Sequence, residues 1–257
     1  MIAWLHYFEP QAVLFDLGLF KIYWYGLFMA AAMLLCFLTL QRLSRAEAAR
    51  RAHWWNLSVY LIIFGLLGAR LYHILFYNAS YFISQPWEML RLWHGGLAIY
   101  GAIFGGLITV YFYTHKHRLS FWSYADMLAI VLPLGQALGR WGNYFNQELY
   151  GRACYFDWCI PISGRAGFFH PVFLYESMLN LLLFGILYGC YRAKKFATGV
   201  ITFCYLIGYA VIRFFLEFLR LDVSQTSGGL KWVQWLCLTI ILFSALAIFK
   251  ILPKRNQ

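Results

Sequence analysis

Residues 121–152 read FWSYADMLAIVLPLGQALGRWGNYFNQELYGR and carry the clearest indication of the fold class. The first part, up to Gly139, is an apolar run close to the length of about 20 helical residues that crosses a bilayer core. Directly after it stand an arginine, Arg140, and a segment rich in glycine, asparagine and glutamate. The stretch therefore predicts a membrane-spanning helix that ends in a polar segment at one face of the bilayer.

The composition of the whole chain supports the same class of protein. Of its 257 residues, 62% are hydrophobic and only 12% are charged, whereas a soluble domain is about 45–50% apolar and about 25% charged. Such a chain has too little polar surface to cover itself in water. We therefore exclude a soluble domain, a disordered chain and a secreted disulfide scaffold, and predict an integral membrane protein.

Six further apolar runs are long enough to cross the membrane. Because lipid does not tolerate unpaired backbone polar groups, and because the alternating strand pattern of a barrel is missing, we interpret all seven runs as helices. The predicted fold is all-α: a polytopic membrane protein with seven transmembrane helices and a small extracytoplasmic loop region, in a single integral membrane domain over residues 1–257. The predicted spans are about 19–40, 56–77, 95–113, 121–139, 172–190, 199–219 and 232–252.

The positions of lysine and arginine predict the orientation. Twelve of the 21 lie in the segments 41–55, 114–120 and 191–198 and in the tail after residue 249, which the alternation of spans places on one side. Cytoplasmic loops carry the excess of basic residues, so we expect a cytoplasmic C-terminus and an extracytoplasmic N-terminus. The segment 140–170 then forms an extracytoplasmic head loop. This pattern also accounts for the net charge of +11 without a nucleic-acid partner.

Four of the six cysteines lie inside apolar runs, where a thiol usually acts as a small core residue. The other two, Cys154 and Cys159, share the predicted head loop. Both a disulfide in an oxidising compartment and two free thiols fit this spacing, so both alternatives stay open. The cysteines do not repeat with metal-ligand spacing, and we expect no metal and no cofactor.

The segment 139–152 is the first candidate site. An arginine at membrane depth costs about 2.5–3.5 kcal/mol on insertion scales, so we expect Arg140 to have an anionic partner. The neighbouring glycines let a ligand approach the backbone, and Asn143 and Asn146 supply uncharged donors. Because a guanidinium is a planar fork suited to phosphate oxygens, the segment indicates a phosphate site. The alternative is an arginine that ends a helix and extends to the interface.

A second candidate cluster lies near the end of the sixth predicted span. Spacings of four and seven residues place Arg213, Glu217 and Arg220 on one helical face. A salt-bridged stripe facing neighbouring helices is the structural alternative. Because Arg213 is the deeper of the two arginines, we assign it to the ligand and assign Arg220 to the pairing with Glu217.

Weaker candidates lie in the first three spans and at the start of the fifth. Tyr25 follows a tyrosine and a tryptophan, so an aromatic belt explains it equally well. Arg70 is a charge inside the second span, which by default indicates a functional site. His94 precedes two glycines that allow close helix contact or ligand approach. Pro171 and Glu176 indicate structural capping at the start of a helix.

Taken in order, these runs resemble the prolipoprotein diacylglyceryl transferase family of bacterial inner membranes. The resemblance covers essentially the whole chain. It rests on the long signature Gly-Arg-x-Gly-Asn-x-x-Asn-x-Glu-x-x-Gly at 139–151, with Tyr-Gly in the first span, Gly-Ala-Arg-Leu-Tyr in the second, Gly-Gly-Leu-Ala-x-x-Gly in the third, His-Pro-x-x-Leu-Tyr-Glu at 170–176 and Arg-x-x-x-Glu-x-x-Arg at 213–220.

The resemblance implies transfer of the diacylglyceryl group of phosphatidylglycerol to the lipobox cysteine thiol of a prolipoprotein signal peptide, with release of glycerol 1-phosphate. It also implies a multi-pass protein of the bacterial inner membrane, in contact with membrane lipid, whose site faces the outer leaflet. The family's essential arginines correspond to Arg140 and Arg213. Its other important positions correspond to Tyr25, Asn143, Glu148 and Gly151.

The general base that would deprotonate the thiol stays open among Tyr100, His94 and Glu148. A lipid transporter or lipid-binding protein is the alternative from another functional class. It accounts for seven spans, but it does not require a glycine- and asparagine-rich signature confined to one face. The residues expected to bind substrate are Tyr25, Arg70, Asn143, Asn146, Gly151, Glu217 and Arg220.

Overall fold

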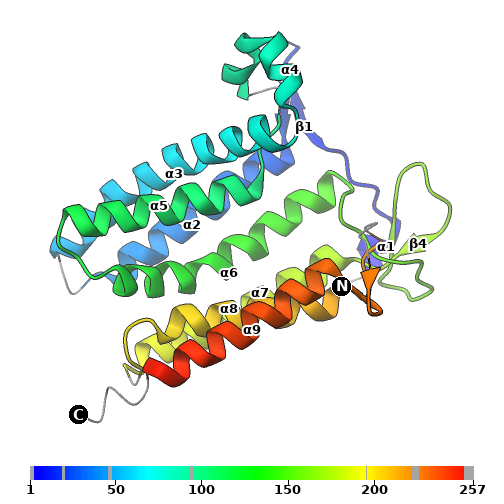
Figure 1. The fold of residues 1–257 in the computed structure, drawn as a ribbon. Coiled ribbons are helices and arrows are strands. Elements are labelled where there is room, and N and C mark those ends of the chain that lie inside the picture. Colours follow the sequence, from blue (N-terminus) through cyan, green and yellow to red (C-terminus); the bar gives the residue numbers. More distant parts are fainter. Residues whose placement is uncertain are drawn as a thin grey trace. The chain divides into compact units, whose positions relative to one another are not determined.

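A computed structural model describes residues 3–18, 21–45, 48–92, 95–194, 196–221 and 226–251. These residues form long helices joined by short strands and loops, as Figure 1 shows. The long helices are α2 (Trp24–Leu43), α3 (Ala48–Phe76), α5 (Ile99–Lys116), α6 (Phe121–Phe145), α7 (Val172–Arg192), α8 (Val200–Leu216) and α9 (Trp232–Ile251); the short ones are α1 (Ala3–Tyr7), α4 (Ala79–Ser84) and the 3-10 helix η1 (Pro86–Leu90).

The described strands form three antiparallel pairs. They are β1 (Val13–Asp16) with β2 (Lys21–Tyr23), β3 (Ile160–Pro161) with β4 (Phe168–Phe169), and β5 (Thr226–Ser227) with β6 (Leu230–Lys231). The first pair shows why the predicted span that starts near residue 19 begins later, at Trp24. The backbone of Lys21–Tyr23 is hydrogen-bonded to β1, so it is unavailable to a helix.

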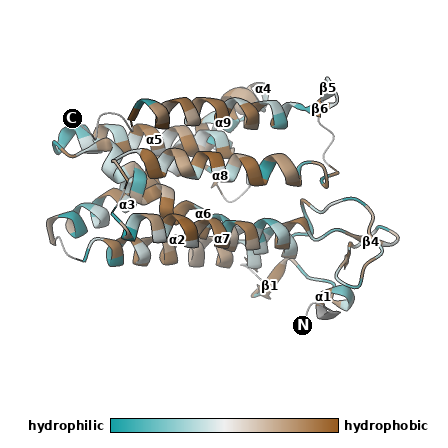
Figure 2. Ribbon diagram, turned by 90° about the horizontal axis from the view of Figure 1, so that it is seen from below, coloured by the Kyte–Doolittle hydropathy of each residue, from teal (hydrophilic) through white to brown (hydrophobic). Residues whose placement is uncertain are grey.

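Each of the seven predicted spans falls on one of the long helices, and Figure 2 shows how much of their length is apolar. Among the described residues, five helices are long and apolar enough to cross a membrane: α2, α3, α6, α7 and α9. Helix α8 is a shorter apolar helix. The chain is therefore an all-α polytopic membrane protein, and the count of seven spans stays a prediction.

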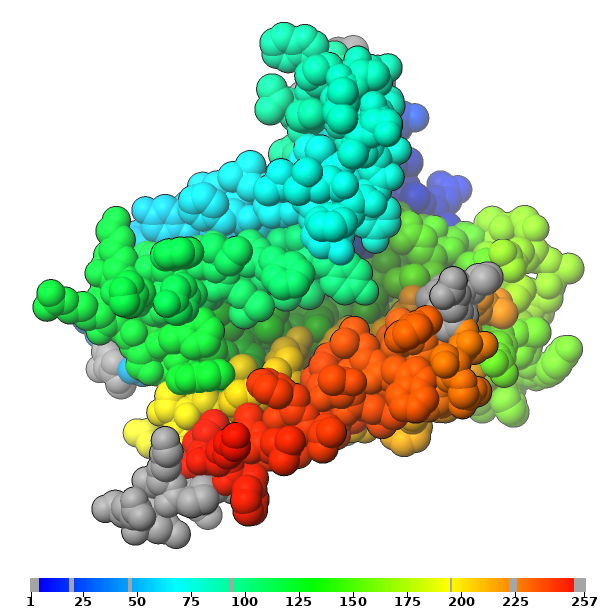
Figure 3. Space-filling model, in the orientation of Figure 1, coloured from blue at the N-terminus to red at the C-terminus, as the bar shows by residue number. Residues whose placement is uncertain are grey.

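Helix α9 illustrates how these helices meet their surroundings. Trp232, Leu242, Phe243 and Phe249 on this helix are each more than 60% exposed, and Figure 3 shows α9, orange to red, at the surface of the face that it draws. In water, so much contiguous apolar surface would drive association. The same surface is what a helix presents to lipid.

Residues 40–125 form one of two compact units, and the contact between α3 and α5 holds this unit together. Glycines line that contact. A Cβ atom on Gly68 would lie 3.2 Å from the Cα of Gly105, and a Cβ on Gly105 would overlap the carbonyl of Phe64. Small residues let two helix backbones approach closely in a membrane. A Cβ on Gly101 would likewise overlap the backbone of Gly68. Gly101 and Gly105, in the third predicted span, therefore serve close contact between the two helices.

We expect Gly105→Ala to lower the free energy of unfolding by about 1–3 kcal/mol, because the added methyl forces the two helices apart. Gly106→Ala is a matched control on the same helix, since its Cβ would meet only the flexible Leu61 side chain at 3.8 Å. Thermal unfolding of the purified protein in detergent measures both. Equal melting temperatures for the two variants would contradict the close contact.

Residues 1–39 and 126–257 form the other unit, in which α6 contacts three other helices. The Cys36 thiol of α2 donates to the carbonyl of Val131 at 3.2 Å. The Ser177 hydroxyl of α7 donates to the carbonyl of Ala137 at 2.9 Å. On the α8 side, the amide of Gln136 donates to the hydroxyl of Tyr205 at 2.9 Å. Helix α6 thus carries its C-terminal segment into the middle of this unit.

Asp126, near the start of α6, caps the start of α8. Its carboxylate accepts hydrogen bonds from the backbone N–H groups of Gly199 at 2.6 Å and Thr202 at 2.8 Å, and from the Thr202 hydroxyl at 2.6 Å. A carboxylate at a helix N-terminus satisfies free N–H groups and is stabilised by the helix dipole. This buried side chain therefore determines where α8 begins and attaches it to α6.

Asp126→Ala should lower the free energy of unfolding by about 1–2 kcal/mol, the usual effect of losing a helix cap. Asp16→Ala is the comparison, because Asp16 forms an exposed ion pair with Lys21 at 3.2 Å and such pairs contribute about 0–1 kcal/mol. Denaturation monitored by circular dichroism distinguishes the two. A loss no larger in the Asp126 variant than in the Asp16 variant would refute the capping role.

Candidate active site

Arg140, at the end of α6, forms a buried ion pair with Glu176 of α7. Its Nη2 lies 2.6 Å from Glu176 Oε1, and the Glu176 side chain is only 1% exposed. Its Nη1 donates to Oδ1 of Asn143 at 3.3 Å. A buried charge persists only where it is paired and hydrogen-bonded, and the two groups meet that requirement for each other. Glu176 was expected to cap the start of a helix, whereas the structure makes it the partner of Arg140.

Tyr209, on α8, completes the surroundings of this pair. Its hydroxyl donates to Glu176 Oε1 at 3.5 Å and lies close enough to interact electrostatically with Arg140 and Arg213. The Asn180 amide donates to the Glu176 carbonyl at 2.9 Å and is fully buried. Tyr209 is not among the residues predicted from the sequence. The available signal was its spacing of four residues from Arg213, which places both side chains on one face of α8.

Arg213 meets Glu217, where Lys231 also binds. Arg213 Nη2 lies 2.9 Å from Glu217 Oε2, and Lys231 Nζ lies 3.2 Å from Glu217 Oε1. The expectation assigned the pairing with Glu217 to Arg220, whereas the structure gives Arg213 a direct contact with this carboxylate. The reason is geometric, because the i to i+4 spacing along α8 brings Arg213 and Glu217 side by side.

Each of the two arginines keeps one N–H group without a hydrogen-bond partner among the described residues. These atoms are Nε of Arg140 and Nη1 of Arg213, and both are inaccessible to solvent. Buried polar groups are almost always satisfied, so an exception of this kind needs an explanation. Two buried guanidinium donors without a partner among the described residues are candidates to bind an anion.

The two asparagines of the signature hold its glutamate. Asn143 Nδ2 donates to Glu148 Oε2 at 3.4 Å, and Asn146 Nδ2 donates to Glu148 Oε1 at 3.2 Å. Because Asn143 also contacts Arg140, the carboxylate of Glu148 is linked to the first arginine through one amide. The structure therefore brings together four of the predicted site residues, all from the stretch 139–151.

The backbone between these residues is in an unusual conformation. Gln147 and Leu149 both have positive φ, at 54° and 57°, a conformation that costs non-glycine residues about 1–3 kcal/mol and that clusters at functional sites. Hydrogen bonds of the Gln147 side chain offset this cost, since its amide donates to the carbonyl of Pro10 at 3.0 Å and to the Ser163 hydroxyl at 3.0 Å.

Tyr25 and Gly142 make direct contact across α2 and α6. A Cβ on Gly142 would lie 2.7 Å from Cδ2 of Tyr25, so only glycine leaves room for this ring. Gly139, one turn earlier, shows ordinary spacing, since its Cβ would lie 3.6 Å from the sulfur of Met29. The structure thus places the Tyr25 ring against Gly142 of the signature.

Gly151 joins three segments of backbone. It forms a bridge with Arg220, its N–H donates to the carbonyl of His170 at 2.9 Å, and the next N–H, that of Arg152, donates to the carbonyl of Leu219 at 2.8 Å. A Cβ on Gly151 would lie within 3.0 Å of His170, Leu219 and Val172 atoms. Close packing is therefore one physical reason for glycine here, at a position expected to bind substrate.

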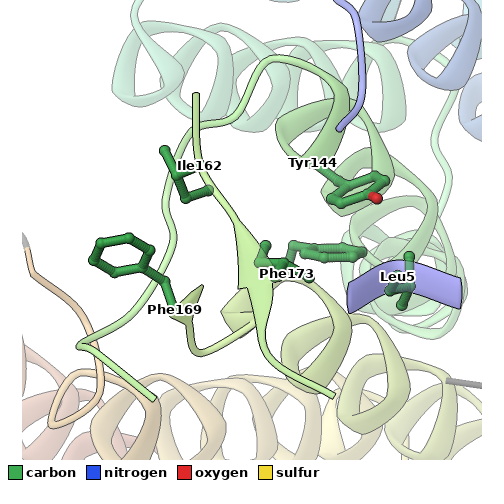
Figure 4. Packing of buried hydrophobic residues seen from close by; sticks show 6 residues of the cluster. Leu5, Tyr144, Ile162, Phe169 and Phe173 are labelled. Carbon is green, nitrogen blue, oxygen red and sulfur yellow. The ribbon is translucent and has the colours of Figure 1, made fainter. Parts of the chain in front are cut away.

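The head loop packs on the end of α6 through an apolar cluster. Figure 4 shows the Tyr144 and Phe173 rings facing each other beside Leu5, and the two rings are stacked with centroids 4.5 Å apart. Ile162 and Phe169 belong to the same cluster. In the same loop, Cys154 and Cys159 form a disulfide, which decides between the two alternatives that the sequence left open.

Arg70 and Tyr100 belong to the unit formed by residues 40–125. The buried guanidinium of Arg70 donates to the carbonyls of Met89 and Gly96, both at 3.1 Å, and to three other carbonyls of residues 88–95. It therefore organises the loop between η1 and α5. Tyr100 is about half exposed near the start of α5, and His94 lies outside the described residues.

Long apolar helices and two buried arginine–carboxylate pairs define a polytopic membrane protein with a candidate anion site. A family model described as prolipoprotein diacylglyceryl transferase matches residues 12–250. The chain belongs to this family.

Relatives from several bacteria are similar over most of this chain. A phosphatidylglycerol–prolipoprotein diacylglyceryl transferase of Synechocystis sp. is 37% identical over 254 residues, which cover 93% of this chain and 89% of the relative. The protein of the same name from Symbiobacterium thermophilum is 38% identical over 241 residues, covering 90% and 88%. The one from Fervidobacterium nodosum is 37% identical over 258 residues, covering 95% and 86%.

We expect Glu176→Gln to lower the free energy of unfolding by about 3–5 kcal/mol, because it leaves the Arg140 guanidinium buried without a counter-charge. The double variant Arg140→Met with Glu176→Met should recover most of this loss, since no buried charge remains. Melting temperatures in detergent test both statements. The pairing would be disproved by a single variant as stable as the wild type.

Proposed function

We propose that this protein transfers the diacylglyceryl group of phosphatidylglycerol to the lipobox cysteine thiol of a prolipoprotein, releasing glycerol 1-phosphate. The thiol sulfur attacks the glyceryl carbon that carries the phosphate, the carbon–oxygen bond breaks, and a thioether forms. The thiol proton passes to a base. The names of the relatives support this activity and both substrates.

The pair of unsatisfied guanidinium donors is the observation that carries the proposal. Nε of Arg140 and Nη1 of Arg213 have no hydrogen-bond partner among the described residues, and the Tyr209 hydroxyl donates to Glu176, the partner of Arg140. A phosphodiester with one negative charge becomes a phosphomonoester that develops a second one. Donors aimed at the leaving oxygens stabilise this transition state more than the ground state, which is the condition for catalysis.

The thiol needs activation as well, because the thiolate is the nucleophile. The positive field of the two arginines favours the thiolate, so the same groups act on both substrates. Among the three candidate bases, Glu148 is the one for which contacts supply an argument, since Asn143 links its carboxylate to Arg140. We therefore favour Glu148 as the proton acceptor, with Tyr100 and His94 as the alternatives.

We further propose a multi-pass topology in the bacterial inner membrane, with seven spans in a single integral membrane domain, an extracytoplasmic N-terminus and a cytoplasmic C-terminus. The active site then faces the outer leaflet, where a lipid donor and a translocated precursor meet. The lysine and arginine distribution supports this orientation. The disulfide of the head loop supports it independently, because disulfides persist in oxidising compartments and are rare in the cytosol.

The direct test incubates a lipobox peptide with phosphatidylglycerol and the purified protein in detergent, and measures the diacylglyceryl adduct by mass spectrometry. We expect the wild type to form the thioether and Arg140→Ala to lose at least about 100-fold in kcat/KM, the usual effect of removing a donor that stabilises a developing anion. Arg152→Ala is the matched control, because this arginine of the head loop is exposed.

The outcomes separate the functions. An adduct in the wild type and in Arg152→Ala, but not in Arg140→Ala, supports both the reaction and the phosphate-binding role. Full activity of Arg140→Ala would contradict that role. A wild type without adduct, under conditions in which a known transferase works, would favour lipid binding or transport instead.

A further inference from the structure

The carboxylate of Glu217 is shared by two cations on its two oxygens. Arg213 lies at Oε2 and Lys231 at Oε1, and the side chains of Arg213 and Lys231 are only 17% and 16% exposed, against 1% for Glu217. Glu217 thus has a cation at each of its two oxygens. The carboxylate of Glu176 contacts Arg140 through Oε1. Among the described residues, Glu217 therefore differs from Glu176 in having a second cation at its carboxylate.

The two contacts of Glu217 differ in kind. Lys231 Nζ donates a hydrogen bond to Oε1, whereas Oε2, which faces Arg213, has no partner with hydrogen-bond geometry among the described residues. Lys231 also donates to the backbone carbonyls of Glu217 at 3.3 Å and Arg220 at 3.0 Å. These carbonyls follow the last turn of α8, where the helix dipole is negative and a cation is favourable. Lys231 thus neutralises both the carboxylate and the helix end.

The backbone of Lys231 is fixed where β6 meets α9. Its N–H donates to Oε1 of Gln234 at 2.9 Å, and the Gln234 amide donates in turn to the carbonyl of Phe214 on α8 at 3.2 Å. Gln234 is almost completely buried. The backbone of Lys231 is therefore anchored through Gln234 to α8, and the ammonium group reaches the carbonyls at the end of the same helix.

We propose that Lys231 is a positioning residue of the phosphate site. By neutralising Glu217, it leaves the charge of Arg213 and its free Nη1 donor available to the phosphodiester of an anionic glycerophospholipid. Without Lys231, the carboxylate of Glu217 would be left to Arg213 alone and would hold that guanidinium more tightly. This inference rests on the proposed function and assigns to it a residue outside the signature motifs.

The test compares three substitutions at Lys231. Lys231→Gln removes the charge but keeps an N–H donor for the carbonyls of Glu217 and Arg220, Lys231→Arg keeps the charge, and Lys231→Met removes both. We expect the Gln and Met variants to raise the KM for phosphatidylglycerol about tenfold, as loss of one nearby unit charge does in a partly screened site, with a smaller change in kcat. Lys231→Arg should stay within about threefold of the wild type. Lys21→Met, at an exposed ion pair, is the matched control.

A purely structural role at the end of α8 makes a different prediction. Lys231→Gln would then behave like the wild type, and Lys231→Met would lower the melting temperature and kcat without raising the KM for phosphatidylglycerol. That result would overturn the proposal, and so would an unchanged KM in both variants.

A second measurement separates this proposal from the function on which it rests. Native mass spectrometry of the purified protein with phosphatidylglycerol reports lipid binding without turnover. If the wild type transfers no diacylglyceryl group but binds phosphatidylglycerol about tenfold more tightly than Lys231→Gln, the enzymatic function fails and the charge role of Lys231 stands. If transfer is normal and binding is equal in the two proteins, only the role of Lys231 fails.

Discussion

Two buried carboxylates determine how the rest of the site can be arranged. Glu176 and Glu217 are each about 1% exposed, and an unpaired ion at such depth costs several kcal/mol. Each carboxylate therefore requires a cation, and in both cases an arginine of a neighbouring turn or helix supplies it. The consequence is that the protein's own carboxylates hold two guanidiniums inside an apolar helix assembly. In the proposed function these positive charges serve the phosphate, because they are already dehydrated and in place.

Glycine plays the complementary part by removing bulk where backbones or rings must meet. Between α3 and α5, glycines let two helices come into backbone contact. In the signature, Gly142 makes room for the Tyr25 ring, and Gly151 makes room for the Leu219 carbonyl and for the side chains of His170 and Val172. The same residue type thus serves helix packing in one unit and site construction in the other. From the sequence alone, each of these glycines could allow either helix contact or ligand approach. The atoms that surround each glycine in the structure decide which of the two roles it has.

The helices were predictable because membrane crossing demands long apolar runs, and each predicted run coincides with a long helix. The signature residues were predictable as a group because they lie within one short stretch of sequence that is rich in glycine and asparagine. The pairing was harder to predict. Glu176 is 36 residues from Arg140 and Lys231 is 14 residues from Glu217, and no local spacing rule connects them. Tyr209 was hidden among other aromatic residues of α8, where an aromatic side chain is ordinary. Partner choice in the buried site thus depends on how helices pack, which periodicity does not specify.

The backbone junction at Gly151 limits how the protein can move. Its hydrogen bonds connect the loop after α6 with the segment after α8 and with the start of α7. The segments that carry Arg140, Arg213 and Glu176 are therefore connected to one another by backbone hydrogen bonds at one end of their helices. A lipid with two acyl chains has to enter between elements that contact each other only through side chains. In lipid, breaking backbone hydrogen bonds costs far more free energy than separating apolar surfaces. We therefore expect the helices to separate for the substrate at a distance from this end. The distances between the charged groups can then persist while the helices separate and close.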